Sequence, residues 1–368
     1  MTALTLCSPR RGVLTPRPLL SGSAPLALLF KLWIIFMVFV GLHLSAGETV
    51  RIATYNVENL FDLERSGNEY AEYIPNTPWQ WNEKNYRKKL RSIARVIAEM
   101  KPDVIGLEEI ESDKALRDLQ IEIKRARLYL PYRAIADAKP SVVKNALLSR
   151  LPIKVKREVK VSNSEHLRNI LEVQLDTGGK PLYVFVNHWK SKSGPESLRV
   201  LSAKALKARL DALGNVSYVL LGDFNSDYDE KHLFLRKRKH NDTDGITGIN
   251  DILRTMQDGR GVAYGDLRRC PECAYDLWYE LPGLQRWSHN FYGQKEALDH
   301  IIISPALADG KGNDYIKGSF ARFGPDYLLT KKGAPYRWQR SRTYPKHHTG
   351  RGYSDHLPLY ADFTIGGE

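Results

Sequence analysis

The chain has 368 residues and a formal net charge of +13, with 42% hydrophobic and 26% charged residues. This composition supports a packed core and excludes a chain that is disordered throughout. The length suits one large domain or two small ones, and we find no internal repeat.

The first 46 residues are predicted to be a leader. Basic residues without any acidic residue precede the apolar run Leu32–Leu42, and the small-residue pattern Leu44-Ser-Ala46 follows. This order is typical of a secretory signal peptide. We therefore expect cleavage before Gly47 and a secreted or periplasmic protein. The alternative is an uncleaved membrane anchor, since Ala24–Leu44 is about long enough to span a bilayer.

The predicted mature chain remains basic. Removing the leader takes away Arg10, Arg11, Arg17 and Lys31, so the net charge falls from +13 to about +9. A basic globular enzyme favours a polyanionic substrate, because contacts to phosphates release counterions. The alternative is that the charge serves solubility alone.

Beyond Gly47 the chain alternates predicted strands and helices. Helices are predicted at residues 83–100 and 196–213, and residues 170–175 and 181–189 are predicted to form a hairpin. The residues expected to face inward are Leu90, Ile93, Ile97 and Met100 in the first helix, and Leu198, Leu201, Ala205 and Ala208 in the second. Further strands are predicted around residues 51–58, 104–109, 145–153, 218–225 and 297–303.

Two stretches, residues 226–296 and 306–352, are predicted to be long loops with short helices. Both combine basic and aromatic residues, as in Arg236–His240 and in the set Lys331, Lys332, Arg337 and Arg340. Such loops favour contact with nucleic acid over mere solvated decoration. A lipid substrate would instead require an exposed apolar hairpin, and no clear one is visible in the sequence.

Cys270 and Cys273 are the two cysteines beyond the leader. An even number of cysteines in an exported protein predicts a disulfide. Free thiols, or half of a zinc site, are the alternatives, although the sequence has no second cysteine pair to complete such a site.

Six polar motifs lie at the ends of predicted hydrophobic strands. Each supplies Asp, Glu, Asn or His, and six such strand ends indicate one converging site. The motifs are TYNVEN at 54–59, LEEIE at 107–111, NHWKSK at 187–192, GDFNS at 222–226, LDHI at 298–301 and SDHLP at 354–358.

Taken in order, these motifs resemble those of the endonuclease/exonuclease/phosphatase family, the Mg-dependent phosphodiesterases that include DNase I-like nucleases. The resemblance extends over residues 50–365, and although each motif alone is weak, all six in family order are a specific signal. It implies one catalytic domain over residues 47–368. The implied fold is a four-layer α/β sandwich, in which two mixed β-sheets pack face to face with helices outside.

The resemblance implies a Mg²⁺ site, with Mn²⁺ as an alternative ion. Glu109 is the leading ligand, and Glu58 and Asp355 are the others. Mg²⁺ prefers oxygen ligands and needs only one or two carboxylates. In the family the first residue of the Glu108-Glu109 pair is usually Gln, so Glu108 is an additional carboxylate, expected to support the site or to be exposed.

The resemblance also implies the catalytic residues. Asp223 activates or orients the attacking water, with Asn225 beside it, and Asn56 holds phosphate oxygens or catalytic groups. His188 is expected to donate a proton to the leaving oxygen. His356 is expected to pair with Asp299, either as general base or as a phosphate-binding cation.

Lys190, Lys192 and Arg168 are predicted to bind the substrate. Lys190 and Lys192 lie within NHWKSK and can clamp a phosphate, and Arg168 precedes a strand and can support the site. Solvent exposure is the alternative for Arg168. His300, His347 and His348 are expected to be non-catalytic.

The leading interpretation is a secreted, Mg-dependent endonuclease or nonspecific nuclease that acts on DNA or RNA. It is expected to be a monomer without an obligate protein partner. The alternatives are a lipid phosphodiesterase of the sphingomyelinase type, a phosphoesterase of a small metabolite, and a catalytically silent nucleic-acid-binding module. The last is disfavoured because every expected polar position is occupied.

Overall fold

The computed structural model describes residues 47–366, apart from residues 140, 165 and 235–240. The predicted leader and the basic run Arg236–His240 therefore lie outside the described residues. Within the described part, no helix is both long enough and apolar enough to cross a membrane.

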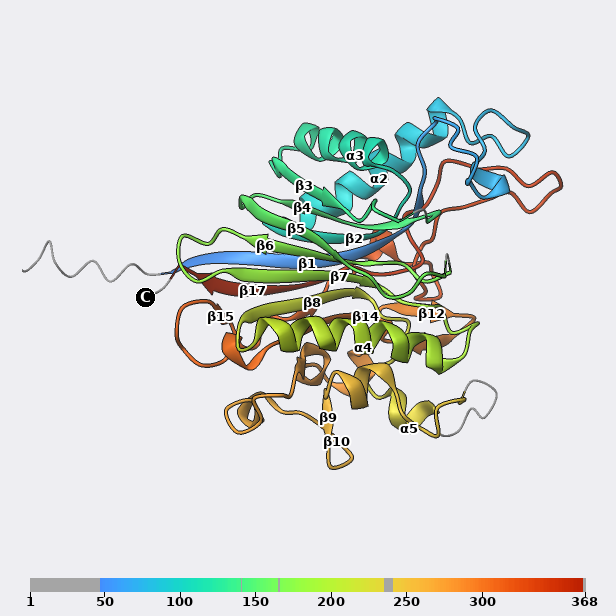
Figure 1. Ribbon diagram of the computed structural model, residues 1–368. Coiled ribbons are helices and arrows are strands. Elements are labelled where there is room, and N and C mark those ends of the chain that lie inside the picture. The colour runs from blue at the N-terminus through green and yellow to red at the C-terminus, as the bar shows by residue number, and fades with distance from the viewer. Residues whose placement is uncertain (1–46, 140, 165, 235–240, 367–368) are drawn as a thin grey trace, which may run out of the picture. The chain divides into compact units, whose positions relative to one another are not determined.

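Two β-sheets form the centre of the domain (Figure 1). The first sheet has the strand order β15 (Asp314–Tyr315), β17 (Leu359–Ile365), β1 (Glu48–Leu60), β2 (Val104–Ile110), β4 (Lys144–Ser149) and β3 (Tyr132–Ile135), with β16 (Ala321–Arg322) also paired to β17. The second has the order β11 (Tyr275–Asp276), β14 (Asp299–Ile303), β8 (Ser217–Asp223), β7 (Leu182–His188), β6 (Ile170–Leu175) and β5 (Ile153–Val159).

Helices and short hairpins complete the described fold. The helices are α2 (Glu83–Met100), α3 (Asp113–Arg125), α4 (Glu196–Leu213) and α5 (Glu230–Phe234). The short helical turns are η1 (Ala71–Tyr73), η2 (Gly248–Ile252), η3 (Tyr264–Asp266), η4 (Leu277–Glu280), η5 (Gly283–Gln285), η6 (Pro305–Leu307) and η7 (Asp326–Leu328). Two hairpins stand apart from the sheets: β9 (Met256–Gln257) with β10 (Arg260–Gly261), and β12 (His289–Phe291) with β13 (Gln294–Glu296).

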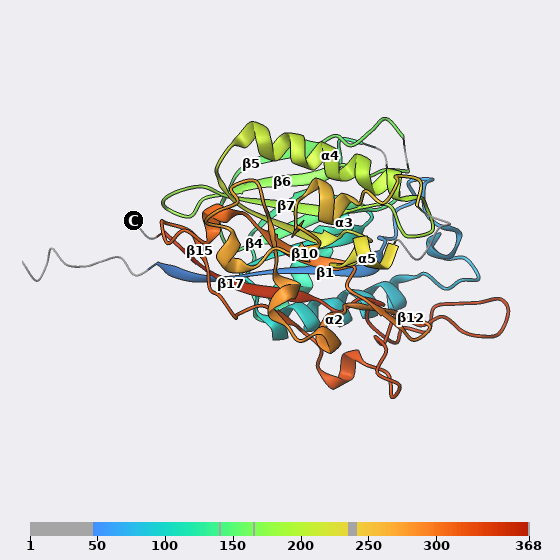
Figure 2. The same cartoon turned by 90° about the horizontal axis from the view of Figure 1, so that it is seen from below.

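The sheets and helices stack in four layers, as the family resemblance implies. Alternate residues of the strands face opposite sides, so each sheet buries both faces. The sheets pack on each other through residues such as Ile52 and Leu221. The first sheet packs on α2 and α3, and the second packs on α4, as Figures 1 and 2 show. A side chain at Gly106 would approach Leu221 Cδ1 to 2.1 Å, so the sheets lie too close for one there.

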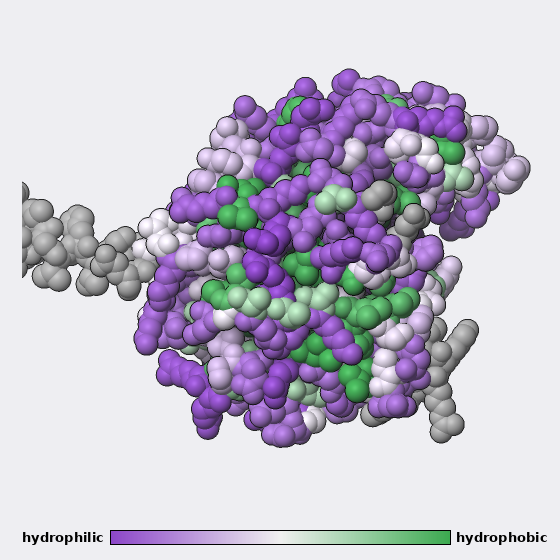
Figure 3. All heavy atoms as spheres, viewed as in Figure 1, coloured by the Kyte–Doolittle hydropathy of each residue, from purple (hydrophilic) through white to green (hydrophobic). Residues whose placement is uncertain are grey.

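Helix α2 has the predicted bounds and the predicted buried face. Asn82 caps its start by accepting from the backbone N–H of Asn85, and Lys101 ends it in the left-handed conformation. The expected inward residues are all buried, and the opposite face is charged. Figure 3 accordingly shows the part of the surface over α2 and α3 as mostly hydrophilic.

Helix α4 also has the predicted bounds, but its predicted inward face is wrong. Leu201 is 44% exposed, and Glu196 and Arg199 are buried instead. These two form an ion pair of 2.6 Å, and Glu196 also accepts from the backbone N–H of Gly248. The apolar residues that do face inward are Val200, Ala203, Leu206 and Leu210.

Strand directions bring the six polar motifs to one rim. β1 runs parallel to β2, and β7 runs parallel to β8, so their carboxyl ends point the same way. β14 and β17 run antiparallel to β8 and β1, so LDHI and SDHLP lie at that rim just before or at the start of their strands. The register places Asp299 directly opposite Asp223.

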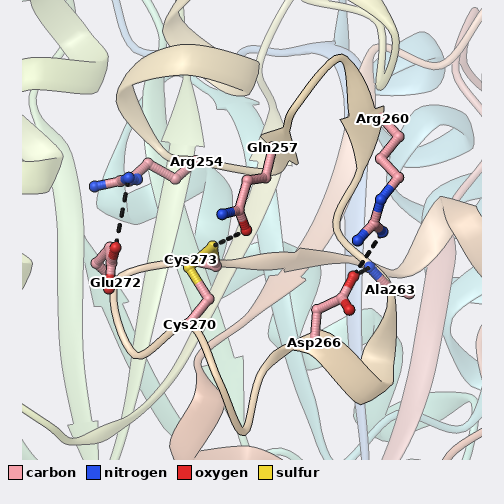
Figure 4. The surroundings of a disulfide bond; sticks show 8 residues. All are labelled: Arg254, Gln257, Arg260, Ala263, Asp266, Cys270, Glu272 and Cys273. Atoms are coloured by element: carbon pink, nitrogen blue, oxygen red, sulfur yellow. Dashed lines mark hydrogen bonds and ion pairs between the residues drawn. A yellow bond between two sulfur atoms is a disulfide. The ribbon is translucent and has the colours of Figure 1, made fainter.

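The predicted disulfide is present between Cys270 and Cys273 (Figure 4). Both cysteines are buried, and Cys273 Sγ lies 3.7 Å from the side-chain oxygen of Gln257. An ion pair between Arg254 and Glu272 flanks the bridge. The disulfide thus stabilises the long segment between β8 and β14, away from the rim.

Candidate active site

Asn56, at the end of β1, connects the two sheets at the rim. Its side-chain amide donates to Glu109 Oε1 at 3.3 Å and to Asp223 Oδ2 at 3.1 Å. Its own side-chain oxygen accepts from the backbone N–H of Glu58. The predicted role of Asn56 in holding catalytic groups therefore has a geometric basis, because its amide sets the positions of two carboxylates.

Three site residues have left-handed backbone conformations. Glu58, Glu109 and Asn225 have φ angles of 52°, 66° and 49°. Such conformations are uncommon for residues other than glycine and often occur at functional sites. Glu58 and Glu109 lie at irregularities in the pairing of β1 and β2, and Asn225 follows the end of β8, so all three side chains lie at the rim.

His356 forms the predicted pair with Asp299. Its Nδ1 lies 2.7 Å from Asp299 Oδ2, and its Nε2 points toward Asp223 Oδ2 at 3.9 Å. Burial disfavours a charged ring, but the ion pair with Asp299 outweighs burial and raises the pKa of His356 well above its ordinary value. The geometry favours His356 as a cation over His356 as a general base.

The ring of His188 is uncharged, in contrast to the ring of His356. Burial, together with the charges of Arg168 and His356, lowers its pKa well below the ordinary value, so the ring is neutral. Its Nε2 lies 3.6 Å from Asp223 Oδ2 and 3.9 Å from Glu109 Oε1. A neutral and a positively charged histidine thus face Asp223, and His188 is suited to hydrogen bonding at neutral pH.

Asp223 lies at the centre of these contacts. Its Oδ1 accepts from the backbone N–H of Asn225, and its Oδ2 accepts from Asn56. Burial raises its pKa to about 7, although the positive charge of His356 acts against this. A carboxylate that titrates near neutral pH suits a general base. The Asn225 side chain donates to the Trp189 carbonyl, which fixes the GDFNS turn.

Glu109 and Asp355 are neighbouring carboxylates that line one cavity and can hold a divalent cation. Burial and the neighbouring charge of Asp355 raise the pKa of Glu109. A bound cation would therefore relieve the repulsion between these two carboxylates. Their oxygens are the hard ligands that Mg²⁺ and Mn²⁺ accept. The residues present therefore fit the predicted metal.

Glu58 is engaged by the protein itself. Its Oε1 accepts from Arg337 at 2.6 Å, and its Oε2 accepts from the backbone N–H of Trp338. Arg337 also lies 3.2 Å from Asp355 Oδ2. Glu58 would bind a metal directly only after Arg337 moved, so in this arrangement it supports the site through Arg337.

A second group of possible metal donors contains nitrogen. One donor atom from each of His289, Asp355 and His356 lies within 4.8 Å of the others. Nitrogen donors favour transition metals. However, His356 is held as an imidazolium by Asp299, and a protonated ring is a poor ligand, so the carboxylate pair fits a metal better.

Glu108 is fully buried and is not exposed. Thr54 donates to its Oε1 at 3.0 Å, whereas its Oε2 has no hydrogen-bond partner among the described residues. Burial, with Asp299 and Asp223 nearby, raises its pKa well above the ordinary value, so the side chain is a neutral acid. It therefore takes the place of the usual family Gln without adding a charge.

The predicted substrate-binding cations differ in their surroundings. Lys192 is paired with Glu230 at 2.7 Å and Glu296 at 3.0 Å, so its charge is already balanced. Lys190 and Arg168 line a cavity of about 320 Å³. This cationic cavity reaches the catalytic centre, because Glu109 and His188 also line it.

A larger cavity of about 870 Å³ lies at the same centre, lined by Asp223, Asn225, Asp355 and His356 among others. Its outer wall includes Phe291 and Tyr292 of the β12–β13 hairpin, and Phe291 is 57% exposed. The prediction that the chain has no clear exposed apolar hairpin is therefore incomplete. Phe291 followed by Tyr292-Gly293, the two residues of the turn, is the sequence signal for this hairpin.

Other residues of the site also escaped sequence reasoning. Lys89 is fully buried and donates to the Tyr353 carbonyl at 2.7 Å, which fixes the segment before Asp355. Lys89 lies within helix α2, whose amphipathic pattern is otherwise ordinary, so no local sequence feature predicts its burial. Of the basic loop residues, Arg340 pairs with Glu72 at 2.9 Å, as Arg337 pairs with Glu58. These two cations are thus committed within the protein.

Comparison with known proteins identifies relatives of this chain. The sequence pattern of the Endonuclease/Exonuclease/phosphatase family matches residues 51–267. No match is found among curated proteins.

Solved structures share the fold. Humanized D. rerio TDP2 is 16% identical, with a TM-score of 0.54, covering 86% of this chain and 99% of that chain. D. rerio TDP2 complexed with a single strand DNA product is 14% identical, with a TM-score of 0.53, covering 86% and 100%. A mannosyl-6-phosphatase of Bacteroides thetaiotaomicron VPI-5482 is 15% identical, with a TM-score of 0.50, covering 86% and 100%. At these identities the likeness concerns the fold.

Proposed function

This chain belongs to the endonuclease/exonuclease/phosphatase family, and from that premise we propose that it is a metal-dependent nuclease that hydrolyses phosphodiesters. The observation that carries this proposal is the convergence on Asp223 of a neutral His188 and a charged His356, beside the carboxylates of Glu109 and Asp355. Acid–base groups beside a cation site are the requirements of phosphodiester hydrolysis.

Each residue then has a role. Asp223 orients and deprotonates the attacking water, and Asn56 holds Asp223 in place. His356, kept positive by Asp299, stabilises the charge that develops on the phosphate oxygens. His188, whose ring is neutral, donates a hydrogen bond on the same side of the site. A divalent cation held by Glu109 and Asp355, when bound, would polarise a phosphate oxygen.

The nuclease assignment rests on the surroundings of this centre. Lys190 and Arg168 line a cavity that continues from Glu109 and His188, and it can take a second phosphate of a polyanion. The TDP2 structure with a single strand DNA product shows that a protein of this fold can hold such a strand. A sugar phosphatase is the second candidate, since the mannosyl-6-phosphatase shares the fold.

A substrate panel tests the proposal. The purified protein would be given plasmid DNA, RNA, sphingomyelin vesicles, mannose 6-phosphate and bis-p-nitrophenyl phosphate, with Mg²⁺ or with EDTA. We expect metal-dependent cleavage of the nucleic acids and of the nitrophenyl diester, and Glu109→Ala should abolish both. Faster hydrolysis of the sugar phosphate than of any nucleic acid would contradict the nuclease assignment.

A further inference from the structure

The β12–β13 hairpin carries a row of rings that leads out of the catalytic centre. The His289 ring lies 4.7 Å from the His356 ring, and the Phe291 ring lies 6.4 Å from the His289 ring at an interplanar angle of only 17°. Tyr292 meets Phe291 edge-on at 4.7 Å. His289 and Phe291 are two apart on a strand, so they project from the same face.

The hairpin is rigidly attached to the catalytic residues. His289 forms a β-bridge with His356, and the carbonyl of the buried Ser288 accepts from the backbone N–H of Leu357. The Ser288 hydroxyl accepts from the backbone N–H of Asp299 at 3.1 Å. The base of the hairpin is therefore joined to both members of the Asp299–His356 pair, and the position of its rings is fixed relative to Asp223.

The turn keeps the two outer rings at the cavity. Tyr292 and Gly293 have φ angles of 48° and 95°, which is the geometry of a tight two-residue hairpin turn. Asn290 accepts from the backbone N–H of Gly293 and fixes this turn. Phe291 and Tyr292 both line the large cavity, yet Tyr292 is 94% exposed. Apolar faces left open to solvent beside reacting groups indicate a binding surface.

We propose that Phe291 and Tyr292 form a stacking wall for the nucleobase of the nucleotide next to the scissile phosphate. This inference rests on the proposed function and deepens it. The exposed Phe291 ring can stack on a planar group, with Tyr292 standing edge-on beside it, and base–aromatic stacking is tolerant of sequence. Cations line the cavity on the other side of Glu109 and His188, where a further phosphate fits. The two sides of the centre thus match the base and the backbone of one strand.

Dinucleoside phosphates test the wall. Thymidylyl-thymidine would be compared with two analogues in which an abasic sugar replaces the 5′ or the 3′ nucleoside. With wild-type protein and Mg²⁺, we expect one analogue to show a KM higher by roughly 5- to 100-fold, the range for loss of one stacked base. In Phe291→Ala and Tyr292→Ala that difference should shrink, because KM for the intact dinucleotide rises while KM for the abasic analogue does not.

Two further variants separate stacking from general apolar contact. Phe291→Trp should retain the preference for the base, whereas Phe291→Leu should lose it. Leu284→Ala is the matched control, because Leu284 is as exposed as Tyr292 but does not line the cavity.

The possible outcomes are distinct. Equal KM values for the intact and abasic substrates in wild-type protein would contradict the stacking wall but not the proposed nuclease activity. Failure to cleave any dinucleotide, with the nitrophenyl diester still hydrolysed, would overturn the nuclease proposal itself. If Phe291→Ala lost binding to sphingomyelin vesicles with unchanged dinucleotide kinetics, the hairpin would be a membrane contact and the stacking wall would be wrong.

Discussion

The side-chain amide of Asn56 donates to Oδ2 of Asp223 across 3.1 Å, although 167 positions separate them in the chain. The two residues belong to different sheets, since Asn56 lies on β1 and Asp223 on β8. The bond can therefore form only when the sheets are correctly packed. Catalysis in this protein should be sensitive to any change that alters the distance between the sheets.

The Asn56 bridge gives the first prediction. Asn56→Ala should lower kcat on bis-p-nitrophenyl phosphate by about 10²- to 10³-fold, the usual loss for a preorganised hydrogen-bond donor at an active site. Asn313→Ala is the control, because Asn313 is an equally buried amide that binds the Lys180 carbonyl beside β15, at the opposite rim. It should reduce thermal stability and leave kcat nearly unchanged. Equal losses of kcat in both variants would show that Asn56 has no specific role in positioning Asp223.

The adjacent acids Glu108 and Glu109 are predicted to respond differently to the same change. Glu109→Gln should weaken Mg²⁺ binding, measured by calorimetry, and lower kcat by orders of magnitude, because it removes an anionic ligand. Glu108→Gln should preserve both, since Glu108 is already a neutral acid bonded to Thr54. A loss of Mg²⁺ affinity in Glu108→Gln that matched the loss in Glu109→Gln would mean that Glu108 is a ligand.

The two histidines at Asp223 should act as a unit. His188→Ala and His356→Ala should each lower kcat by about 10²-fold or more. The double variant should lose less than the product of the two, because residues that act together are not additive. Asp299→Asn should lower kcat by weakening the positive charge of His356. His232→Ala, an exposed ring outside the site, is the control. Near-normal turnover in His188→Ala would reassign His188 to a structural role.

The buried ion pair between His300 and Asp276 should make the free energy of unfolding depend on pH. His300 donates to Asp276 at 2.7 Å and to the Ser226 carbonyl at 2.8 Å, and all three lie in the interior. Burial opposes the charge, but Asp276 raises the pKa of His300 above its ordinary value. The stabilisation is therefore complete below the pKa of an unfolded histidine, about 6.5, and is lost as the pH rises through the folded pKa.

Asp276→Asn tests this dependence. The variant should be less stable than the wild type by roughly 3 kcal/mol at pH 6, the range for breaking a buried pair. The difference should be smaller at pH 9 than at pH 6, because raising the pH favours the neutral ring. Denaturant unfolding of both proteins at the two pH values measures the effect. A difference that does not change with pH would show that His300 is neutral in the folded protein.

Export is predicted from the leader pattern of the first 46 residues. Expression in a secreting bacterial host should yield a protein whose N-terminus lies near Gly47. Mass spectrometry of the exported protein gives the cleavage position directly. An intact leader in the membrane fraction would instead indicate an anchored enzyme.

The sequence predicts the fold and the convergence of the six motifs well. Strands and helices such as α2 have strong local periodicity, and the order of the motifs identifies the family. The prediction of which face of α4 is buried is wrong, because the buried pair Glu196–Arg199 interrupts the apolar pattern. Local hydropathy assigns both residues to the surface. Their burial is explained by partners outside the helix: the backbone N–H of Gly248 for Glu196, and the carbonyls of Lys190 and Ser191 for Arg199.

The charges of the site residues were less predictable than their positions. Sequence places two acids at 108 and 109, but only the packing shows that one is a buried neutral acid. Likewise, Arg337 reads as a free basic residue of a loop and is in fact bound to Glu58 and Asp355. Such pairings depend on which loops meet at the rim, and no local pattern encodes them.

The position of Arg337 affects how the protein should behave when no divalent cation is bound. The carboxylates of Glu58 and Asp355 keep a positive partner supplied by the chain itself. Removal of the cation should therefore leave their mutual repulsion partly compensated and the fold intact. If the proposed metal site is used, we expect the protein to lose and regain the ion without unfolding.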